Sequence, residues 1–248
     1  LPGIGNPAAA ASDALVVWVP EALAPAVRAE VATGFRGRAV TVVPTDVTDL
    51  RRALDAAEPG QEPDIVWAPG TATGELVGAG LVERLPLSQV LRDEFPPNVL
   101  DAFRFGFAYY GIPVQYENVA LVVNRDLVPE ALDSFADVER SARRLVNDDT
   151  AMVGIAVGQV PDGGAVALGP LFVGLGGYLF GRNPAGSLDP YNVGLNSAEF
   201  RSNADAIDRW NRNGLLSASL DDRAAQEAFL GGRAPFWLTG PRSTRVLD

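Results

Sequence analysis

The chain offers few residue types that could carry out chemistry. Its 248 residues include no His, no Cys and no Lys, so all 20 basic residues are Arg. Catalysis by Ser-His-Asp or Cys-His groups, zinc bound by His or Cys, a P-loop lysine and a Schiff base are therefore excluded within this chain. Carboxylate-pair catalysis and metal binding through oxygen ligands remain possible.

The glycine-rich segments do not match the motifs that bind cofactors or metals. In LFVGLGG, Gly174 and Gly176 are followed by Leu179 at the third position that a dinucleotide fingerprint requires. Asp162, next to Gly163-Gly164, lacks the regular acidic spacing of a calcium loop. The sequence thus predicts no cofactor, no metal and no catalytic residue.

The charge balance restricts the partners. A net charge of -11 and a pI near 4.5 disfavour nucleic acid and anionic membrane surfaces. Residues 163–181 are uncharged and approach the length of a membrane span, but they are rich in Gly and interrupted by Pro170. They predict a buried helix that ends at Gly176-Gly177. Residues 1–13 lack the features of a signal peptide and predict a flexible N-terminal tether or a disordered end.

Strands and helices alternate in the first half of the chain. Continuous apolar runs at 14–19 and 39–43, and the DIVW segment at 64–67, predict strands. Between them, apolar residues at i, i+4 spacing predict helices, the second of them capped by Asp46 or Thr48. This βαβαβ order predicts a parallel sheet with right-handed crossovers.

The second half predicts another α/β lobe. Strands are expected at 119–124, 153–157 and 236–238, and Ser134 with Asp137 has the spacing of a helix start. A long amphipathic helix is expected from Phe200 through Trp210 to Gly214. The predicted lobes are residues 14–114 and 115–248.

Several segments occur in the order of a known family: LVVWV, PDIVWAPGTATGELVGAGLVERL, GIPVQYENVALVVNRDLVPE, PLFVGLGGYLF and AFLGGRAPFWLTGPRS. The chain resembles the maltose-binding-protein-like class of extracellular solute-binding proteins (family 1 type) from about Leu15 to Asp248. The resemblance implies a two-lobed type II periplasmic-binding-protein-like α/β fold, each lobe a mainly parallel sheet flanked by helices.

The resemblance also implies a function. A small solute, expected to be a sugar or oligosaccharide, is captured between two lobes and delivered to the permease subunits of an ABC transporter. The expected location is extracytoplasmic, either periplasmic or anchored at the cell surface, for example as a lipoprotein. Two alternatives stay open: a sensory or surface-binding module on the same fold, and a glycoside hydrolase with two acids roughly 5–10 Å apart.

By resemblance, ligand contacts follow the strand ends and the crossing between lobes, where ligands of open α/β sheets bind. The expected ligand-binding residues are Glu21, Trp67, Thr71, Tyr116, Glu117, Asn118, Gly164, Arg242 and Ser243.

For several of these residues a second interpretation stays open. Trp67 and Tyr116 could be core aromatics, Glu117 a solvated hinge carboxylate, and Arg242 the partner of a local carboxylate. The chain also departs from the maltose binders of the family. Ala22-Leu23 and Thr71-Ala72 stand where those proteins carry charged pairs, so maltose itself is not the expected ligand.

Family members continue well beyond a segment such as LTGPRSTRVLD, so the chain resembles a family member without its C-terminal part. This leads to an expectation about association. Segments that would cover the apolar face of the 200–210 helix and residues 163–181 are missing from the sequence, and exposed apolar patches mark association sites. The chain is therefore expected to self-associate through these surfaces, or to exist only alongside a second fragment that covers them.

Overall fold

The computed structural model describes residues 14–58, 60–160, 164–184 and 188–247. The predicted tether at 1–13 lies outside the described residues. The chain divides into two compact units, Leu1–Tyr116 and Glu117–Asp248.

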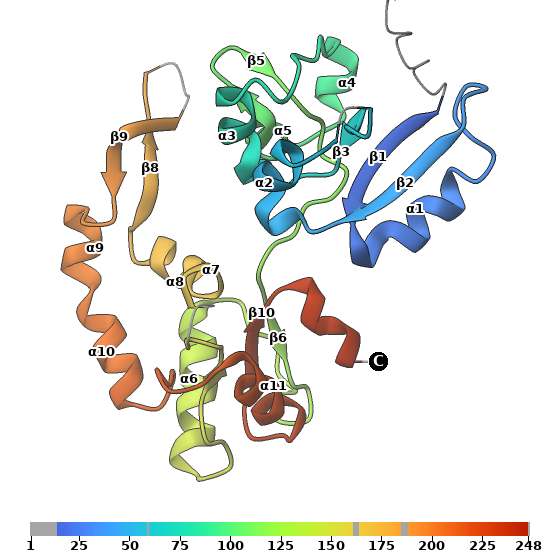
Figure 1. The fold of residues 1–248 in the computed structure, drawn as a ribbon. Helices are drawn as coiled ribbons and strands as arrows, with labels where there is room; N and C mark the ends of the chain where they lie inside the picture. Colours follow the sequence, from blue (N-terminus) through green and yellow to red (C-terminus); the bar gives the residue numbers. More distant parts are fainter. Residues whose placement is uncertain (1–13, 59, 161–163, 185–187, 248) are drawn as a thin grey trace, which may run out of the picture. The chain divides into compact units, whose positions relative to one another are not determined.

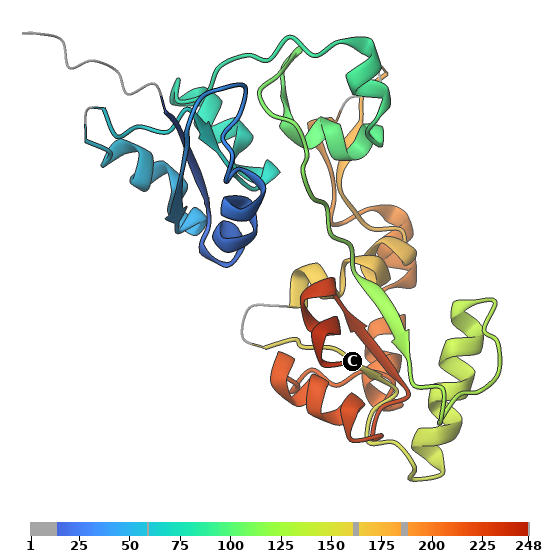
Figure 2. The same ribbon diagram turned by 90° about the vertical axis from the view of Figure 1, so that its right-hand side faces the viewer.

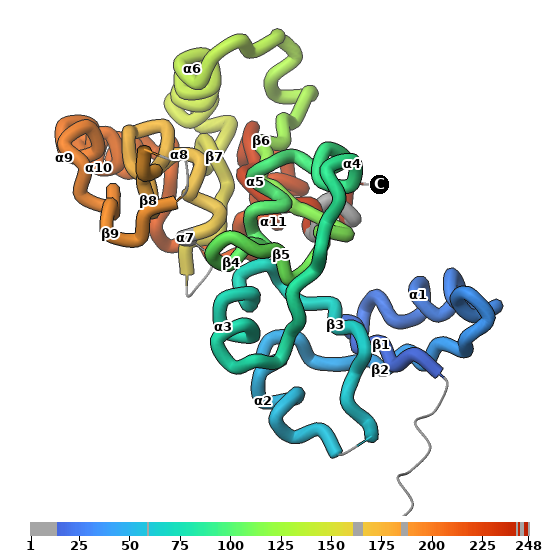
Figure 3. Tube along the Cα trace, turned by 90° about the horizontal axis from the view of Figure 1, so that it is seen from above, coloured from blue at the N-terminus to red at the C-terminus, as the bar shows by residue number. Residues whose placement is uncertain are grey.

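The first unit is built on a three-stranded parallel sheet of order β2-β1-β3 (Figure 1). Its strands are β1 (Leu15–Pro20), β2 (Val40–Thr45) and β3 (Ile65–Val66). Helix α1 (Ala24–Glu30) connects β1 to β2, and α2 (Leu50–Asp55) connects β2 to β3, as the path in Figure 3 shows. The parallel βαβαβ arrangement is the one that the sequence pattern predicts.

Both faces of this sheet are covered, because successive side chains of a strand point to opposite faces. Val19 of β1 packs with Ala24 of α1 and with Val42. Trp18, the neighbour of Val19, packs instead with Leu50 of α2 and with Leu76 of α3 (Thr73–Gly78). The continuous apolar run of β1 therefore reflects burial on two sides.

The rest of the first unit consists of short elements. Helices α4 (Gln89–Asp93) and α5 (Pro97–Leu100) precede a hairpin of β4 (Arg104–Phe105) and β5 (Ala108–Tyr109). Gly106 makes the turn with a φ of 60°, a conformation that glycine adopts without steric cost. The hairpin was not expected from the apolar pattern, because its strands are only two residues long.

The sheet of the second unit has the order β6-β10-β7 and is mixed (Figure 2). Central strand β10 (Phe236–Thr239) runs antiparallel to β6 (Ala120–Val123) and parallel to β7 (Ile155–Ala156). The expectation of a mainly parallel sheet is therefore wrong for this unit. The last strand in sequence inserts between the first two, and its direction matches only one of them.

Helices pack on both faces of this second sheet. Phe236 and Ile155 join a large apolar cluster with residues of α6 (Phe135–Asn147). Trp237 packs in a second cluster with residues of α11 (Asp222–Leu230). Ser134 caps α6 as predicted, accepting a hydrogen bond from the backbone N–H of Asp137 at 3.2 Å.

The uncharged segment at 163–181 does not form the single buried helix that its composition predicts. Its described part forms α7 (Gly164–Ala167), α8 (Gly169–Gly174) and β8 (Tyr178–Arg182), which pairs with β9 (Leu188–Gly194). Leu168 and Pro170 fall where α7 ends and α8 begins, and Gly176 turns the chain with a φ of 92°. Among the described helices none has the length and apolar character to span a membrane.

The amphipathic pattern around Trp210 forms two helices, α9 (Ala198–Asn203) and α10 (Asp205–Arg212), rather than one. Part of its apolar face is covered within the chain. Trp210 is only 6% exposed, and its ring meets that of Phe135, the first residue of α6, edge to face with centroids 5.5 Å apart. Ile207, on the same face, remains 38% exposed. The expectation that this face lacks cover is therefore wrong for Trp210.

Candidate functional site

In the first unit, candidate site residues follow the carboxyl ends of parallel strands, which lie at one edge of the sheet. Glu21 opens the short helix η1 (Glu21–Leu23) directly after β1. Trp67 comes directly after β3, and Thr71 lies in η3 (Gly70–Ala72). Glu21 and Thr71 are exposed and Trp67 is half-buried. This edge is where open α/β sheets bind ligands.

A cavity of about 200 Å³ lies at this edge, between the segments that follow β2 and β3. Thr71 lines it, whereas Glu21 and Trp67 do not. The remaining lining residues are Val47, Thr48, Asp49, Leu50, Arg51, Pro69, Ala72, Glu75 and Leu76. The sequence reasoning missed the four polar members of this second group. For Thr48 and Asp49 the sequence carries a signal, the TDVTD segment shortly after the predicted strand at 39–43, which was interpreted only as a helix cap. No local signal singles out Arg51 or Glu75.

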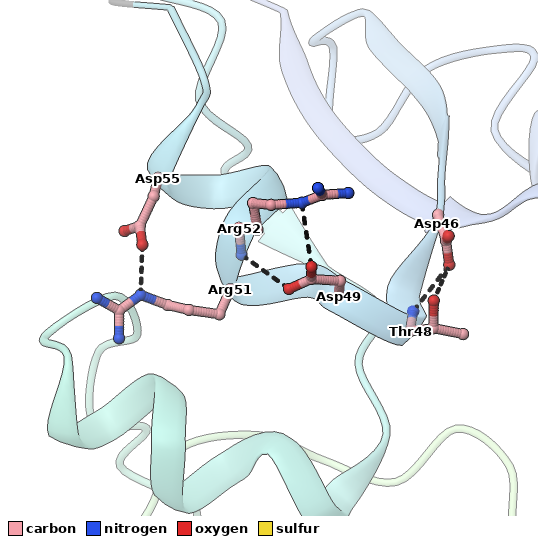
Figure 4. Close-up of polar contacts among 6 residues, drawn as sticks. All are labelled: Asp46, Thr48, Asp49, Arg51, Arg52 and Asp55. Carbon is pink, nitrogen blue, oxygen red and sulfur yellow. Dashed lines mark hydrogen bonds and ion pairs between the residues drawn. The ribbon is translucent and has the colours of Figure 1, made fainter.

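Hydrogen bonds hold the segment after β2 in place (Figure 4). Asp46 Oδ1 accepts hydrogen bonds from the backbone N–H of Thr48 at 2.9 Å and from its hydroxyl at 2.6 Å. Asp46 thereby caps η2 (Val47–Asp49), and Asp49 caps α2. The hydrogen bonds from Thr48 lower the pKa of the Asp46 carboxyl, because they favour its charged form.

Two ion pairs orient the charged residues of α2 (Figure 4). Arg51 Nε lies 2.7 Å from Asp55 Oδ2, and Arg52 Nε lies 3.0 Å from Asp49 Oδ2. Such exposed pairs add little stability, yet they occupy the carboxylate of Asp49. The carboxylate of Glu75, in the first turn of α3, has no hydrogen-bond or ion-pair partner among the described residues. It is the carboxylate of this cavity that is available to a ligand.

The lowered pKa values predict a loss of stability in acid. The pKa is lowered for Asp46 by hydrogen bonds from Thr48, for Asp137 by one from Ser134, and for Glu130 by one from its own backbone. A carboxyl whose pKa is lower in the folded than in the unfolded chain adds stability above its unfolded pKa, about 4. That stability is lost as the pH falls through the folded pKa.

Urea unfolding between pH 6 and pH 2.5 should therefore show that the free energy of unfolding declines below about pH 4. The decline should become shallower in Asp137→Asn, and an unchanged slope would contradict this assignment.

Trp67 has a structural role in addition to its predicted ligand contact. Its backbone N–H donates to the carbonyl of Trp18 at 2.8 Å, which extends the pairing of β3 with β1. Its side chain packs against the apolar cluster of Val19, Ala24 and Val42 on the α1 side of the sheet. The core thus holds most of the indole, and part of it reaches the surface.

The three expected contacts at the crossing between units are consecutive residues, Tyr116 to Asn118. Tyr116 ends the first unit and is 65% exposed. Glu117 and Asn118 open the second unit, and both are exposed. The Asn118 side-chain amide donates to the carbonyl of Val119 at 3.3 Å. Aromatic, acidic and amide groups are therefore all presented to solvent along this segment.

In the second unit, strand pairing brings the other candidates to one edge of the sheet. Thr239, at the carboxyl end of β10, pairs with Ala120, the first residue of β6. Because β7 is parallel to β10, its carboxyl end lies at the same edge. Asn118 precedes β6 at this edge, Gly164 follows β7 as the start of α7, and Ser243 follows β10 in η5 (Pro241–Val246).

Details of these three loops are only partly described. The Ser243 backbone N–H donates to the carbonyl of Gly240 at 3.2 Å. Arg242 belongs to η5, but its side chain lies outside the described residues, as does Asp162, whose surroundings do not match a calcium loop in sequence. None of the described residues form a cluster of three or more acidic side chains that could hold a metal ion.

Close packing beside β7 brings Gly158 against Asp222 of α11. A Cβ on Gly158 would lie 1.9 Å from Asp222 Oδ1, so only glycine allows this approach. Asp222 is the first residue of α11 and is exposed. No spacing rule in the sequence links Gly158 to Asp222, because tertiary packing brings them together.

The described groups at both edges are hydroxyls, carboxylates, amides and aromatic rings, which suit hydrogen bonding and stacking with a polar ligand.

Comparisons with known proteins identify the family of the chain. The family model described as "Bacterial extracellular solute-binding protein" matches residues 20–247. A galactooligosaccharide-binding protein of Bacillus subtilis (strain 168) is 23% identical over 214 residues, which cover 79% of this chain and 46% of that protein. A maltotriose-binding protein of Pyrococcus abyssi (strain GE5 / Orsay) is 28% identical over 211 residues, covering 82% and 43%. The chain thus spans less than half the length of these curated relatives.

Solved structures share the fold. A cyclo/maltodextrin-binding protein complexed with maltotetraose matches with a TM-score of 0.77 and 24% identity, covering 94% of this chain and 61% of that one. An extracellular solute-binding protein from Staphylococcus aureus in complex with maltose matches with a TM-score of 0.82 and 23% identity, covering 95% and 62%. Because the family model matches nearly all of the chain, the chain belongs to the bacterial extracellular solute-binding protein family.

Proposed function

We propose that this chain binds a sugar or oligosaccharide and delivers it to the permease subunits of an ABC importer. Its family consists of extracellular solute-binding proteins and not of enzymes, so the chain is a binding protein. The sugar as ligand, the importer as partner and anchoring as a lipoprotein are parts of the proposal. The two-lobed arrangement of a type II periplasmic binding protein is also part of it.

The observation that carries the proposal is the 200 Å³ cavity at the carboxyl ends of β2 and β3. Hydroxyls of Thr48 and Thr71 and the carboxylate of Glu75 line it beside apolar Leu50 and Leu76. Polar groups placed among apolar ones are typical of small-molecule sites, which usually measure roughly 300–1,000 Å³. The smaller volume here suits one sugar ring, with further rings bound by other residues.

Those further contacts are proposed to come from both units. In the first unit they are Glu21, Trp67 and Tyr116; in the second they are Glu117, Asn118, Gly164, Arg242 and Ser243. A ligand that contacts both units stabilises the arrangement of the units that it binds more tightly.

The relatives support a sugar as the ligand class. By their names they bind galactooligosaccharide and maltotriose, and the two solved relatives hold maltotetraose and maltose. The polar side chains of the cavity, hydroxyls and one available carboxylate, match the many hydroxyls of a sugar. We propose a neutral sugar other than maltose, since Thr71 and Ala72 stand where maltose binders carry charges.

A thermal-shift screen tests the proposal. Mono- and oligosaccharides are compared with amino acids, polyamines and anions, because a ligand that binds only the folded chain raises its stability by about 2.7 kcal/mol at 100 times Kd. At least one sugar should raise the melting temperature. Stabilisation by an amino acid or polyamine, with none by sugars, would overturn the proposed ligand class.

Variants then locate the sugar in the cavity. Glu75→Gln and Thr71→Val should each weaken sugar binding by about 0.5–1.5 kcal/mol in titration calorimetry, because each removes one hydrogen bond. The matched control is Glu83→Gln, an exposed acid that does not line the cavity. Equal affinities in all three variants would remove the cavity from the sugar site.

The hairpin of β8 and β9 supports the proposed self-association. It is a separate two-stranded sheet (Figure 1), and such a sheet is only marginally stable alone in water. Exposed apolar side chains on and beside it are Val173, Leu179, Phe180, Leu188, Tyr191, Val193 and Leu195. We propose that two copies of the chain associate through these residues, which we call the hairpin patch.

Sedimentation equilibrium tests this association. The chain should form a dimer, and Tyr191→Ser should shift it toward monomer, since Tyr191 is 96% exposed within the hairpin patch. The control Val90→Ser changes an exposed residue of α4 in the other unit. A chain that is monomeric at all concentrations would contradict the association.

A further inference from the structure

A second cavity lies away from the carboxyl ends of the strands. It measures about 430 Å³ and is formed by the end of α1, the turn that follows it and strand β2. Its lining residues are Arg28, Val31, Ala32, Thr33, Gly34, Gly37, Arg38, Ala39, Val40 and Val42. No residue lines both this cavity and the 200 Å³ cavity. A ligand here would bind independently of the proposed sugar site.

The charge around this cavity is opposite to that of the whole chain. Residues 24–43 carry Arg28, Arg36 and Arg38 against the single acid Glu30, whereas the chain as a whole has a net charge of -11. Two of these Arg residues line the cavity, and no acidic residue does. The local field therefore favours an anion on a protein whose remaining surface repels one.

Arg28 is held in position at the wall of the cavity. Its Nη2 donates to the carbonyl of Val42 at 3.1 Å. Carbonyls of successive residues in a strand point to opposite sides. The Ala39 carbonyl accepts a hydrogen bond from the Leu15 N–H of β1, so it points toward β1. The Val42 carbonyl, three residues further on, therefore points away from β1, to the free edge of β2. Arg28 makes no ion pair with any described residue. One of its N–H groups is used for positioning, and the others can donate to a ligand.

The edge of β2 does not suit an added strand. Arg28 occupies the Val42 carbonyl, and Pro44, on the same side of β2, has no N–H to donate. Both features are devices that protect an edge strand from pairing. The occupant expected for this cavity is therefore a compact molecule and not an extended peptide.

The remaining walls are apolar or small. Val31, Val40 and Val42 supply apolar surface, and the volume falls within the roughly 300–1,000 Å³ of small-molecule sites. Gly37 at the turn has a φ of 80° and no atom within 4 Å of where a Cβ would be, so this side of the cavity stays open. An inorganic ion would leave most of this volume unfilled.

We propose that this cavity binds a small organic anion, a carboxylate or phosphate ester with an apolar body. Arg28 donates to its charged group, since guanidinium matches the geometry of carboxylate and phosphate oxygens, and the positive charge of Arg38 at the wall adds attraction. The valine side chains pack against its apolar body. We call this the anion cavity.

Nuclear magnetic resonance titration with matched probes tests the proposal. Benzoate and phenyl phosphate are the anionic probes, and benzamide is the neutral probe of similar shape. The anions should shift the amide signals of Ala32, Gly34 and Gly37, and benzamide should bind at least tenfold more weakly. Shifts of the same size with benzamide, or no shifts with either anion, would overturn the proposal.

Substitutions separate binding from folding. Arg28→Gln and Arg38→Gln should each weaken phenyl phosphate binding at least tenfold, whereas Arg84→Gln, an exposed residue that lines neither cavity, should leave it unchanged. Because Arg28→Gln also removes the hydrogen bond to Val42, thermal unfolding is measured for each variant. In the case that Arg28→Gln does not fold, the affinity of Arg38→Gln alone tests the proposal. Unaltered affinity in folded Arg38→Gln would overturn the assignment.

Stronger binding to anionic vesicles than to phenyl phosphate would instead identify a lipid headgroup as the source and overturn the small-molecule claim.

Discussion

Phe236→Ala should lower the free energy of unfolding of the second unit by about 3–5 kcal/mol, the usual cost of removing a buried phenylalanine. Phe236 is fully buried in the central strand β10 and belongs to the main apolar cluster. Its partners in the sheet are Val123 and Ile155, so the loss is felt on both sides of β10. A domain is stable by about 5–15 kcal/mol, and the change would remove a large part of that.

Tryptophan fluorescence during urea unfolding can assign this loss to one unit. The four Trp residues are divided equally, with Trp18 and Trp67 in the first unit and Trp210 and Trp237 in the second. Replacing one pair by Phe reports on the other unit alone. The transition reported by Trp210 and Trp237 should move to lower urea.

The control for this experiment is Leu230→Ala, which truncates an exposed side chain of α11 outside the hairpin patch and should change the free energy of unfolding by less than about 0.5 kcal/mol. If Phe236→Ala shifts both transitions by the same amount, the two units unfold as one. If it shifts neither transition, the central position of Phe236 in the core is wrong.

The parts of the fold that sequence could predict are those whose signal is local. The apolar run of β1 and the capping residues Ser134 and Asp137 each act within a few residues, and the structure has them as expected. Strand direction in the second unit was not predictable in this way. It depends on β10 entering between β6 and β7, which are far from it in sequence. The helix expected at 163–181 failed because apolar composition does not distinguish a buried helix from a glycine-turned hairpin.

The candidate site shows the same division between local and tertiary information. The sequence placed Glu21, Trp67 and Thr71 after strands, and the structure has them there, though their contact with a ligand stays a prediction. It missed Glu75, because only the packing of α3 beside the segment after β2 makes this residue line a cavity.

Trp67→Ala should weaken sugar binding by about 1–3 kcal/mol, by analogy with the stacking of nucleic-acid bases on aromatic side chains. The expectation rests on the proposed sugar site and on the position of Trp67 at the carboxyl end of β3. Its indole is anchored on one side by Val19 and Val42, which fixes the orientation of the ring before a ligand arrives. A ring held in this way loses little conformational entropy on binding.

The same anchoring means that Trp67→Ala changes stability as well as affinity, and the two effects must be separated. Trp67→Phe keeps an aromatic face in the same place and should retain most of the affinity, whereas Trp67→Ala should not. Titration calorimetry with the sugar that stabilises the chain most gives both affinities, at a temperature where thermal unfolding shows each variant to be folded. Trp67 fluorescence, measured after the other three Trp residues are replaced by Phe, should change when that sugar is added. A folded Trp67→Ala variant with unaltered affinity would show that the indole only packs in the core on the α1 side of the sheet. If the sugar stacked on the indole, removing the ring would weaken sugar binding.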